Sequence, residues 1–247
     1  MSDLILLNHA GEPVGGNRSR PANAAGFQIH GVLHKMYPQV NAACHAHSKY
    51  GKAWSTFAKP LDMINQDVTM FYGDAQAVYP EFGGVVLETE ESLRLGRHLG
   101  TKGKLLILRN HGLLTVGQTV DEAAYLFTLA ERSCEIQLQV DAAAAQGMEK
   151  KLIEPGAAEF TFKMTSDPVS ASSSKWLIVA DNTRKRYTVS SSRIMKWRWN
   201  CPTGDFYSES DFDSRIMMAR CTGYNDNYKM VFMSVVRCRI GSGCSRA

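Results

Sequence analysis

The sequence of 247 residues predicts an α/β domain, in which helices and strands alternate along the chain. Short apolar segments bounded by glycine, proline or serine are typical of buried strands. They alternate with segments whose apolar residues recur every three or four positions, as in helices. No long part of the pattern consists of strands alone, which a β-sandwich would require. The composition, with 44% hydrophobic and 21% charged residues, is that of an ordinary globular protein.

The N-terminal part predicts a strand and then a helix. Residues 3–8, DLILLN, form an apolar run typical of a strand, and the HAGEPV that follows is typical of a turn. Between Pro21 and Tyr37, apolar residues recur at spacings of three and four, which predicts a helix. Pro38 ends this helix, because proline has no backbone N–H to donate.

The next two elements surround a pair of histidines. Residues 40–47, VNAACHAH, are mostly small and apolar and predict a buried strand. Residues 48–59, SKYGKAWSTFAK, predict a short helix with Ser48 as its N-cap.

The pattern is mixed from residue 60 to 88, where glycine and proline interrupt it. VTMFY (68–72) and GGVVLE (83–88) are candidate strands there. TEESLRLGRHLG, residues 89–100, then predicts a helix that Gly100 closes.

Two strands and a long helix complete the pattern. KLLILRNHG and LLTVG, residues 104–117, predict two apolar strands broken by a turn at Asn110, His111 and Gly112. Thr119 and Glu122 form a capping box, and apolar residues at helical spacing follow it as far as a glycine at position 147.

The composition changes abruptly near residue 170. Residues 171–247 contain 13 Lys and Arg against 6 Asp and Glu, and Leu177 is their only leucine, whereas residues 1–170 contain 18 leucines. We therefore expect a folded domain over residues 1–170 and a basic, Ser- and Arg-rich tail over residues 171–247. Its TRKRY and KWRWN segments are weak candidates for contact with nucleic acid or acidic lipid.

Histidines provide the candidate functional site. Residues i and i+2 of a strand point to the same face, so His45 and His47 present both imidazoles on one side. Two imidazoles in that arrangement can share a divalent ion such as zinc, and His111 in the predicted turn is the candidate third ligand. By spacing alone, a structural or surface role is the commoner explanation of such a pair. We expect His30 and His34, one helical turn apart, to be packing or surface residues.

The cysteines and the N-terminus bear on the compartment. The six cysteines include no pair with C-x-x-C spacing. The N-terminus resembles neither a signal peptide nor a transit peptide, and no apolar run approaches the roughly 20 residues of a membrane span. These features predict free thiols in a reducing cytoplasm.

Three segments together resemble the class II aldolase/adducin N-terminal domain family, with a similarity that extends from residue 1 to about residue 167. They are MYPQVNAACHAHS, RNHGLLTVG and TVDEAAYLFTLAERSCEIQLQ. Within the family, the segments YGKAWS, NQDV and FYGDA are similar to those of fungal adducin-like members. The resemblance implies a three-layer α/β/α sandwich around a central, mainly antiparallel sheet. Family members carry a further segment before DLIL, so we expect residues 1–170 to be an N-terminally incomplete domain.

The same resemblance implies a metal site. His45, His47 and His111 match the residues that bind zinc in class II aldolases. In those enzymes the metal is a Lewis acid that polarises the carbonyl and enolate oxygens of the substrate. Zn²⁺ is therefore the expected cofactor.

The family's other functional residues are not matched. The acid/base carboxylate of the aldolases matches Gly26, and the serines that hold the substrate phosphate match Ala24 and Ala25. General acid–base catalysis typically contributes about 10²–10⁴-fold. The catalytic and substrate-binding residues therefore stay unknown. Four side chains are candidate substitutes for the carboxylate: Asp67, Tyr72, Asp74 and Tyr79.

Two functions follow from the resemblance. One is a zinc-dependent aldehyde-lyase of the class II aldolase type, acting on a small carbonyl or sugar-phosphate substrate. The alternative is a non-enzymatic, adducin-like scaffold associated with actin filaments and the cytoskeleton. Either implies a homo-oligomer, a tetramer in the family, and a cytoplasmic or cytoskeleton-associated location. A third outcome is a fragment that performs neither function.

Overall fold

The computed structural model describes residues 5–8, 10–19, 21–84, 89–166, 215–221 and 231–235. The strands in these ranges are β1 (Ile5–Asn8), β2 (Pro13–Gly16), β3 (Ala42–Ala46), β4 (Gln76–Tyr79), β5 (Leu105–Leu108), β6 (Gly112–Gly117), β7 (Arg215–Cys221) and β8 (Val231–Val235). They form one sheet in the order β2-β1-β7-β8-β3-β6-β5-β4. The β4–β5 pair is parallel and the other pairs are antiparallel, which confirms the predicted mainly antiparallel sheet.

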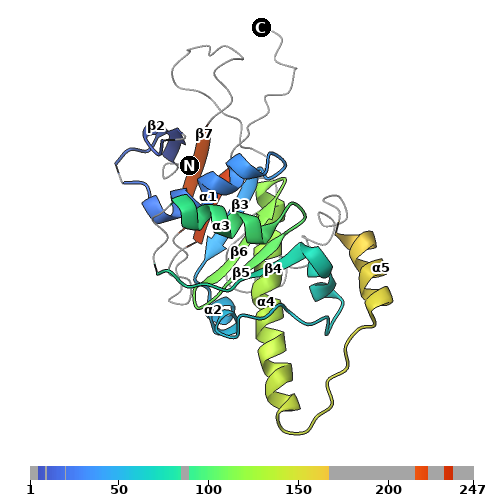
Figure 1. Ribbon diagram of the computed structural model, residues 1–247. Helices are drawn as coiled ribbons and strands as arrows, with labels where there is room; N and C mark the ends of the chain where they lie inside the picture. The colour runs from blue at the N-terminus through green and yellow to red at the C-terminus, as the bar shows by residue number, and fades with distance from the viewer. Residues whose placement is uncertain are drawn as a thin grey trace, which may run out of the picture.

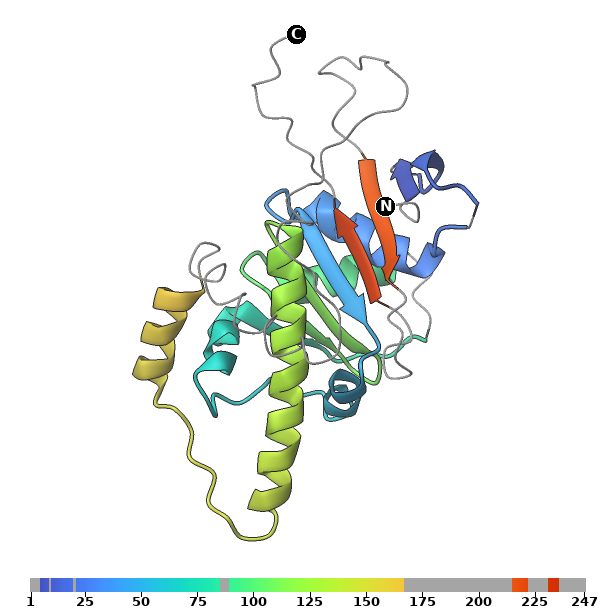
Figure 2. The ribbon, with the colours of Figure 1, turned by 180° about the vertical axis from the view of Figure 1, so that it is seen from behind.

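Helices cover both faces of this sheet and make three layers. They are α1 (Ala24–Met36), α2 (Lys49–Ser55), α3 (Thr89–Leu99), α4 (Val120–Ala144) and α5 (Pro155–Thr165), with 3₁₀ turns η1 (Asp67–Phe71) and η2 (Gly73–Ala75). Figure 1 shows α1 and α3 in front of the sheet, and Figure 2, from behind, shows α4 across its other face. Two separate hydrophobic cores match this division, one against α1 and α3 and one against α2 and α4. The three-layer α/β/α fold is therefore confirmed.

The strand β3 lies inside the sheet and contributes to both cores. Ala42, Cys44 and Ala46 pack in the core beneath α4, whereas Ala43 packs in the core beneath α1 and α3. His45 shares the face of Ala43, because alternate residues of a strand point to the same side. The predicted buried strand is confirmed over Ala42–Ala46, and these five residues are all buried.

Most of the predicted helices are confirmed. Asn23 caps α1, since its side chain accepts from the backbone N–H of Gly26, and the helix ends just before Tyr37 and Pro38. Gly100, with φ of +68°, follows the end of α3. One half of the predicted capping box forms, because Thr119 Oγ1 accepts from the backbone N–H of Glu122 at the start of α4. The Glu122 carboxylate accepts from the backbone N–H of Gln118 instead of completing the box at Thr119.

Four elements differ from the expectation: η1, β2, β4 and α5. VTMFY is not a strand: η1 covers most of it, because Asn65 Oδ1 accepts from Val68 N–H and Thr69 Oγ1 donates to the Gln66 carbonyl. Such local side-chain to backbone bonds compete with sheet pairing. The patterns also missed β4 and α5, and they missed β2, which begins within the predicted turn at Pro13. Of GGVVLE, residues 85–88 lie outside the described ranges.

Two strands come from the segment that composition sets apart. Residues of β7 pair with β1 from Ile5↔Met218 to Asn8↔Arg215. Residues of β8 pair with β3 from Ala42↔Val235 to Ala46↔Val231, and β7 and β8 pair with each other. These two strands therefore connect β1 to the rest of the sheet.

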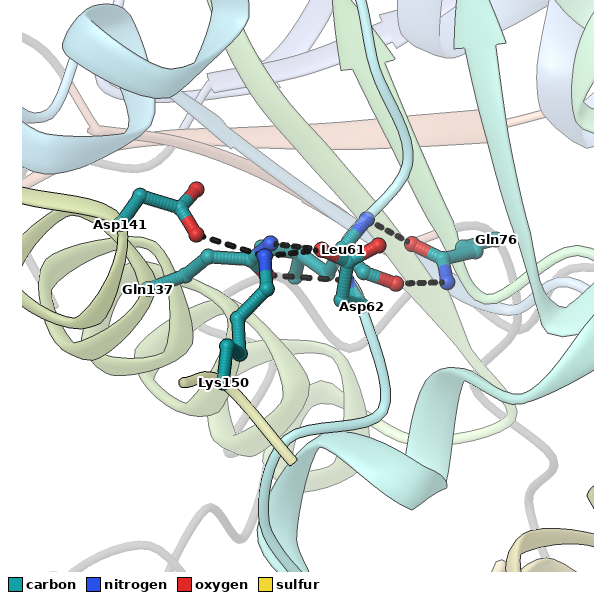
Figure 3. A network of polar contacts seen from close by, with 6 residues as sticks. All are labelled: Leu61, Asp62, Gln76, Gln137, Asp141 and Lys150. Carbon is teal, nitrogen blue, oxygen red and sulfur yellow. Dashed lines mark hydrogen bonds and ion pairs between the residues drawn. The ribbon is translucent and has the colours of Figure 1, made fainter. Parts of the chain in front are cut away.

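A polar network fixes the chain that follows α4 (Figure 3). Lys150 Nζ lies 2.8 Å from Asp62 Oδ2 and 2.7 Å from Asp141 Oδ1. Gln137 donates to the same Asp62 carboxylate and accepts from the Asp62 backbone N–H. Gln76 bonds both backbone groups of Leu61, so the loop after α2 is tied to β4 as well as to α4.

The described helices were also compared with the dimensions of a membrane span. None of them combines the length and the apolarity that crossing a bilayer requires.

Gly51 of α2 packs tightly against Leu113 of β6, and this contact generates the first prediction. A Cβ there would lie 2.7 Å from Leu113 Cγ and 2.5 Å from Ser48 Oγ. Gly51→Ala therefore overpacks the contact, and we expect it to lower the free energy of unfolding by about 1–3 kcal/mol in urea denaturation. The control is Gly156→Ala in the first turn of α5, where a Cβ has nothing within 4 Å. That change should be neutral or stabilising by up to about 1 kcal/mol. Equal effects of the two variants would contradict the packing argument.

Candidate metal centre

His45 is fixed by the interior of the sheet. It lies on β3 with 2% of its surface exposed, paired with Leu114 of β6. Its Nδ1–H donates to the Leu113 carbonyl at 2.8 Å, because a carbonyl oxygen only accepts. In the neutral ring this tautomer places the remaining lone pair on Nε2. A hydrogen bond of this kind to one ring nitrogen is the usual way in which a protein orients a histidine ligand.

His111 is fixed by the turn between β5 and β6. Asn110 before it has φ of +57° and Gly112 after it has φ of +155°. A Cβ on Gly112 would lie 2.6 Å from the Ala46 carbonyl oxygen, so only glycine allows β6 to start this close to the end of β3. This close approach brings His111 beside His47, the residue that follows Ala46.

The structure brings the three predicted histidines together. The Nε2 atoms of His47 and His111 are 2.7 Å apart, and the centroids of these two rings are 4.5 Å apart. The His45 ring lies 5.2 Å from that of His47 and 4.9 Å from that of His111. One ligand nitrogen from each residue lies within 4.8 Å of the other two. This is a group of side chains that could hold a metal ion.

Burial keeps these imidazoles neutral. It lowers the pKa of His45 well below the ordinary 6.5, and the nearby His111 lowers it further. Burial also lowers the pKa of His111 to about 4, with a contribution from His47, and it lowers the pKa of His47, with a contribution from Lys52. A neutral imidazole is the form that binds a metal, so the cluster does not need to lose protons at neutral pH.

His30 and His34 lie outside this cluster. Both are buried on α1, which agrees with the packing role expected for them. His34 Nδ1–H donates to the Val40 carbonyl at 3.0 Å. Burial lowers the pKa of His30 to about 3 and that of His34 to about 4. The His30 side chain acts electrostatically on His45, so α1 provides the surroundings of the cluster.

The residues that match the aldolase acid and phosphate positions lie in the first turn of α1. Gly26, four positions before His30, is buried and has no side chain that could carry a proton. Ala24 and Ala25 precede it and carry no hydroxyl group.

The four candidate substitutes for the carboxylate have different positions. Asp67 lies in η1, and Tyr72 directly follows η1 with its ring 6.5 Å from that of Phe162 of α5. Asp74 is exposed and paired with Lys102 at 3.3 Å. Tyr79, by contrast, is buried at the end of β4 and lines a small cavity of about 10 Å³ that His111 also lines.

Sequence analysis missed three charged residues that line the same cavity. They are Glu81, Glu91 and Arg109. The Tyr79 hydroxyl donates to Glu81 at 3.1 Å, and Glu91 is buried. The only local signal was that Arg109 stands two positions before His111. Beside His111 there is thus a small polar cavity, lined by the carboxylates of Glu81 and Glu91 and the guanidinium of Arg109.

With the geometry described, the chain can be compared with known proteins. The model of the class II aldolase and adducin N-terminal domain matches residues 1–138. The chain belongs to this family. It is 44% identical over 168 residues to the meiotically up-regulated gene 14 protein of Schizosaccharomyces pombe, covering 68% of this chain and 64% of that protein. The expected similarity to fungal members is thereby confirmed.

Two other relatives carry names of different kinds, one of an enzyme and one of an adducin. The chain is 41% identical over 143 residues to decarboxylase NovR of Streptomyces niveus, covering 58% of this chain and 52% of that protein. It is 31% identical over 181 residues to alpha-adducin of Rattus norvegicus, covering 72% of this chain and 24% of that protein. This family member thus spans between about a quarter and two thirds of the length of these curated relatives.

A solved structure supports the same assignment. The L-fuculose 1-phosphate aldolase from Glaciozyma antarctica superposes with a TM-score of 0.62 at 39% sequence identity. The superposition covers 74% of this chain and 70% of that one. The α/β fold of the family member is therefore that of a class II aldolase.

The buried histidines of α1 generate a prediction on pH. Their pKa values are lower in the folded state than the 6.5 of an unfolded chain, so the unfolded state binds more protons below that pH. Stability is complete above pH 6.5 and falls as the pH drops toward 4. Between pH 7 and pH 5 we expect each of the two to cost about 2 kcal/mol, measured by urea denaturation in EDTA.

His34→Asn is the matched variant for this measurement. Asparagine can keep a donor toward the Val40 carbonyl but does not titrate. The loss of stability between pH 7 and pH 5 should be smaller in this variant than in the wild type. The same loss in both proteins would show that His34 does not contribute.

Proposed function

We propose that this family member binds one zinc ion through His45, His47 and His111 and uses it on a carbonyl substrate. The observation that carries the proposal is the convergence of the three imidazoles, with ligand nitrogens within 4.8 Å of one another. Three imidazole ligands are a donor set that zinc accepts, and a three-ligand site leaves a fourth position open, as catalytic zinc sites do. The tautomer of His45 and the low pKa values of all three histidines also fit this role.

The reaction class that this site supports best is cleavage of a carbon–carbon bond next to a carbonyl group. When bound, zinc would supply a Lewis acid that polarises the carbonyl oxygen. Aldol cleavage and decarboxylation both leave charge on such an oxygen, and relatives carry both activities in their names. A small carbonyl compound or sugar phosphate is the proposed substrate class. The proposed enzyme is an aldehyde-lyase of the class II aldolase type.

Proton transfer is the weak point of this chemistry. Gly26 stands where the carboxylate of the aldolases is expected, and glycine has no group that can exchange a proton. Without a general acid or base, we expect aldol cleavage to be slower by about 10²–10⁴-fold. Tyr79, Glu81 and Glu91 share a cavity with His111 and carry groups that can exchange a proton, so they are the proposed substitutes for the missing carboxylate.

A second function is favoured by Gly26. An adducin-like scaffold would keep the fold and need no acid/base group, and alpha-adducin is among the relatives. Under this proposal the chain forms a homo-oligomer, a tetramer by family resemblance, and associates with actin filaments in the cytoplasm or cytoskeleton. The two functions differ in their need for the metal ion: cleavage of a carbonyl substrate requires it, whereas binding to actin filaments does not.

Metal content is the direct test of the first proposal. Purified protein should contain about one zinc per chain by mass spectrometry of the metal, because three neutral imidazoles converge in the fold. His45→Ala, His47→Ala and His111→Ala should each remove it. The control is His98→Ala, since His98 is an exposed residue of α3 outside the cluster. A wild-type protein without bound divalent ion after zinc reconstitution would contradict the proposal.

Actin co-sedimentation tests the second proposal. A scaffold should pellet with filaments, and His47→Ala should pellet equally, because no step of scaffolding uses the metal. An enzyme without a cytoskeletal role should stay in the supernatant at background level. Pelleting that disappears in His47→Ala would contradict the separation of the two functions.

A further inference from the structure

A carboxylate from α4 lies at the start of α2. Glu131 is 5% exposed, and its oxygens accept three hydrogen bonds from that helix start. Tyr50 N–H donates to Oε1 at 2.9 Å and Gly51 N–H donates to Oε2 at 2.7 Å. The Ser48 hydroxyl donates to Oε2 as well. Glu131 is therefore bonded to three of the four residues that follow His47.

These bonds replace an ordinary helix cap. Ser48 stands at the N-cap position of α2, but its side chain makes no capping bond within the helix. The backbone N–H groups at the start of a helix need acceptors, and a negative charge there is favourable. Glu131 provides both from a different element, 83 positions along the chain from Ser48.

The bonds of Glu131 bear on His47, because this residue lies between the end of β3 and the start of α2. His45 lies within the ladder of β3, whose pairing with β6 and with β8 stops at Ala46. His47 is one residue beyond that ladder and one residue before Ser48. Its backbone is therefore held from the sheet on one side and from the start of α2 on the other.

The carboxylate itself is held firmly. The neighbouring α4 residues Phe127, Ala130 and Cys134 are buried in the core between α4 and the sheet. Because α4 is packed in the core, Glu131 holds the start of α2 at a fixed position relative to the core.

We propose that Glu131 is a positioning residue of the metal centre, which holds His47 in its binding geometry through Ser48 and the first turn of α2. The inference rests on the proposed function, since it assumes that the three histidines bind a metal. Groups that orient the ligands of a metal site typically contribute about 10–100-fold to metal affinity. Glu131 touches neither metal nor substrate in this scheme, so it is not a catalytic residue.

The test uses Co²⁺ as a spectroscopic substitute for zinc in the full chain. Glu131→Gln keeps the size of the side chain but replaces one acceptor oxygen with a donor, so it cannot accept all three hydrogen bonds from the start of α2. We expect it to weaken Co²⁺ and Zn²⁺ binding by about 10–100-fold and to shift the visible absorption bands of bound Co²⁺. A purely structural cap would change thermal stability without changing these bands.

Two controls separate positioning from general destabilisation. Glu135→Gln makes the same charge change one turn further along α4. Thr119→Ala removes the cap of α4 itself, which typically costs about 1 kcal/mol, without touching the start of α2. Both should bind Co²⁺ with wild-type affinity and spectrum. A similar loss in Thr119→Ala would overturn the proposal, because destabilisation alone would then explain the effect.

A second variant covers failure of Glu131→Gln to fold. Ser48→Ala removes one of the three donors and keeps the two backbone bonds, so we expect a smaller, several-fold loss of Co²⁺ affinity with the same direction of spectral shift. Unchanged affinity and spectrum in the folded variants, with a wild type that binds, would overturn this inference alone. A wild type that binds neither Co²⁺ nor Zn²⁺ would overturn the proposed function and this inference with it.

Discussion

The strand β3 is covered on both faces and paired along both edges, and the rest of the fold is arranged around it. Its five residues, Ala42–Ala46, are all buried, and four of them are small enough for helices to pack closely on each side. The exception is His45. A buried polar group without a partner costs about 1–3 kcal/mol, so the Leu113 carbonyl has to be placed where it can accept from the ring. That requirement fixes the register of β6 against β3, and this register in turn places the turn that carries His111.

A different structural feature holds each of the three histidines. The sheet ladder holds His45, a glycine-dependent turn holds His111, and the junction between β3 and α2 holds His47. Each of these features involves a different pair of elements, so we expect no single substitution in one of them to displace all three side chains. The same burial that holds them lowers their pKa values. The fold therefore favours the neutral, ligand form at neutral pH, and it becomes less stable in acid for the same reason.

Sequence patterns predicted the parts of this arrangement that depend on neighbours in the chain. The short apolar run of β3, the helical spacing before Pro38 and the N-cap at Thr119 are local, and the family resemblance named the three histidines that the fold brings together. Patterns failed where a distant or unusual contact decides the structure. The apolar VTMFY segment forms a 3₁₀ turn through side-chain bonds to its own backbone. The bonds from Ser48 to Glu131, and the closeness of Gly112 to Ala46, join segments far apart in the sequence, which no local periodicity can reveal.

Positions 45 and 26 differ in what the fold requires of them. The partner of His45 is a backbone carbonyl, so an apolar side chain at position 45 would leave that buried acceptor without its donor, which costs about 1–3 kcal/mol. Glycine inside a helix costs about 1 kcal/mol relative to alanine, so helix stability does not require glycine at position 26. Position 45 thus carries a side chain that the fold uses and that could also hold a metal, whereas position 26 lacks the proton donor that aldol chemistry demands. A site of this composition supports metal binding more directly than it supports the aldolase reaction, and any reaction here needs its proton from another side chain, such as those that line the cavity beside His111.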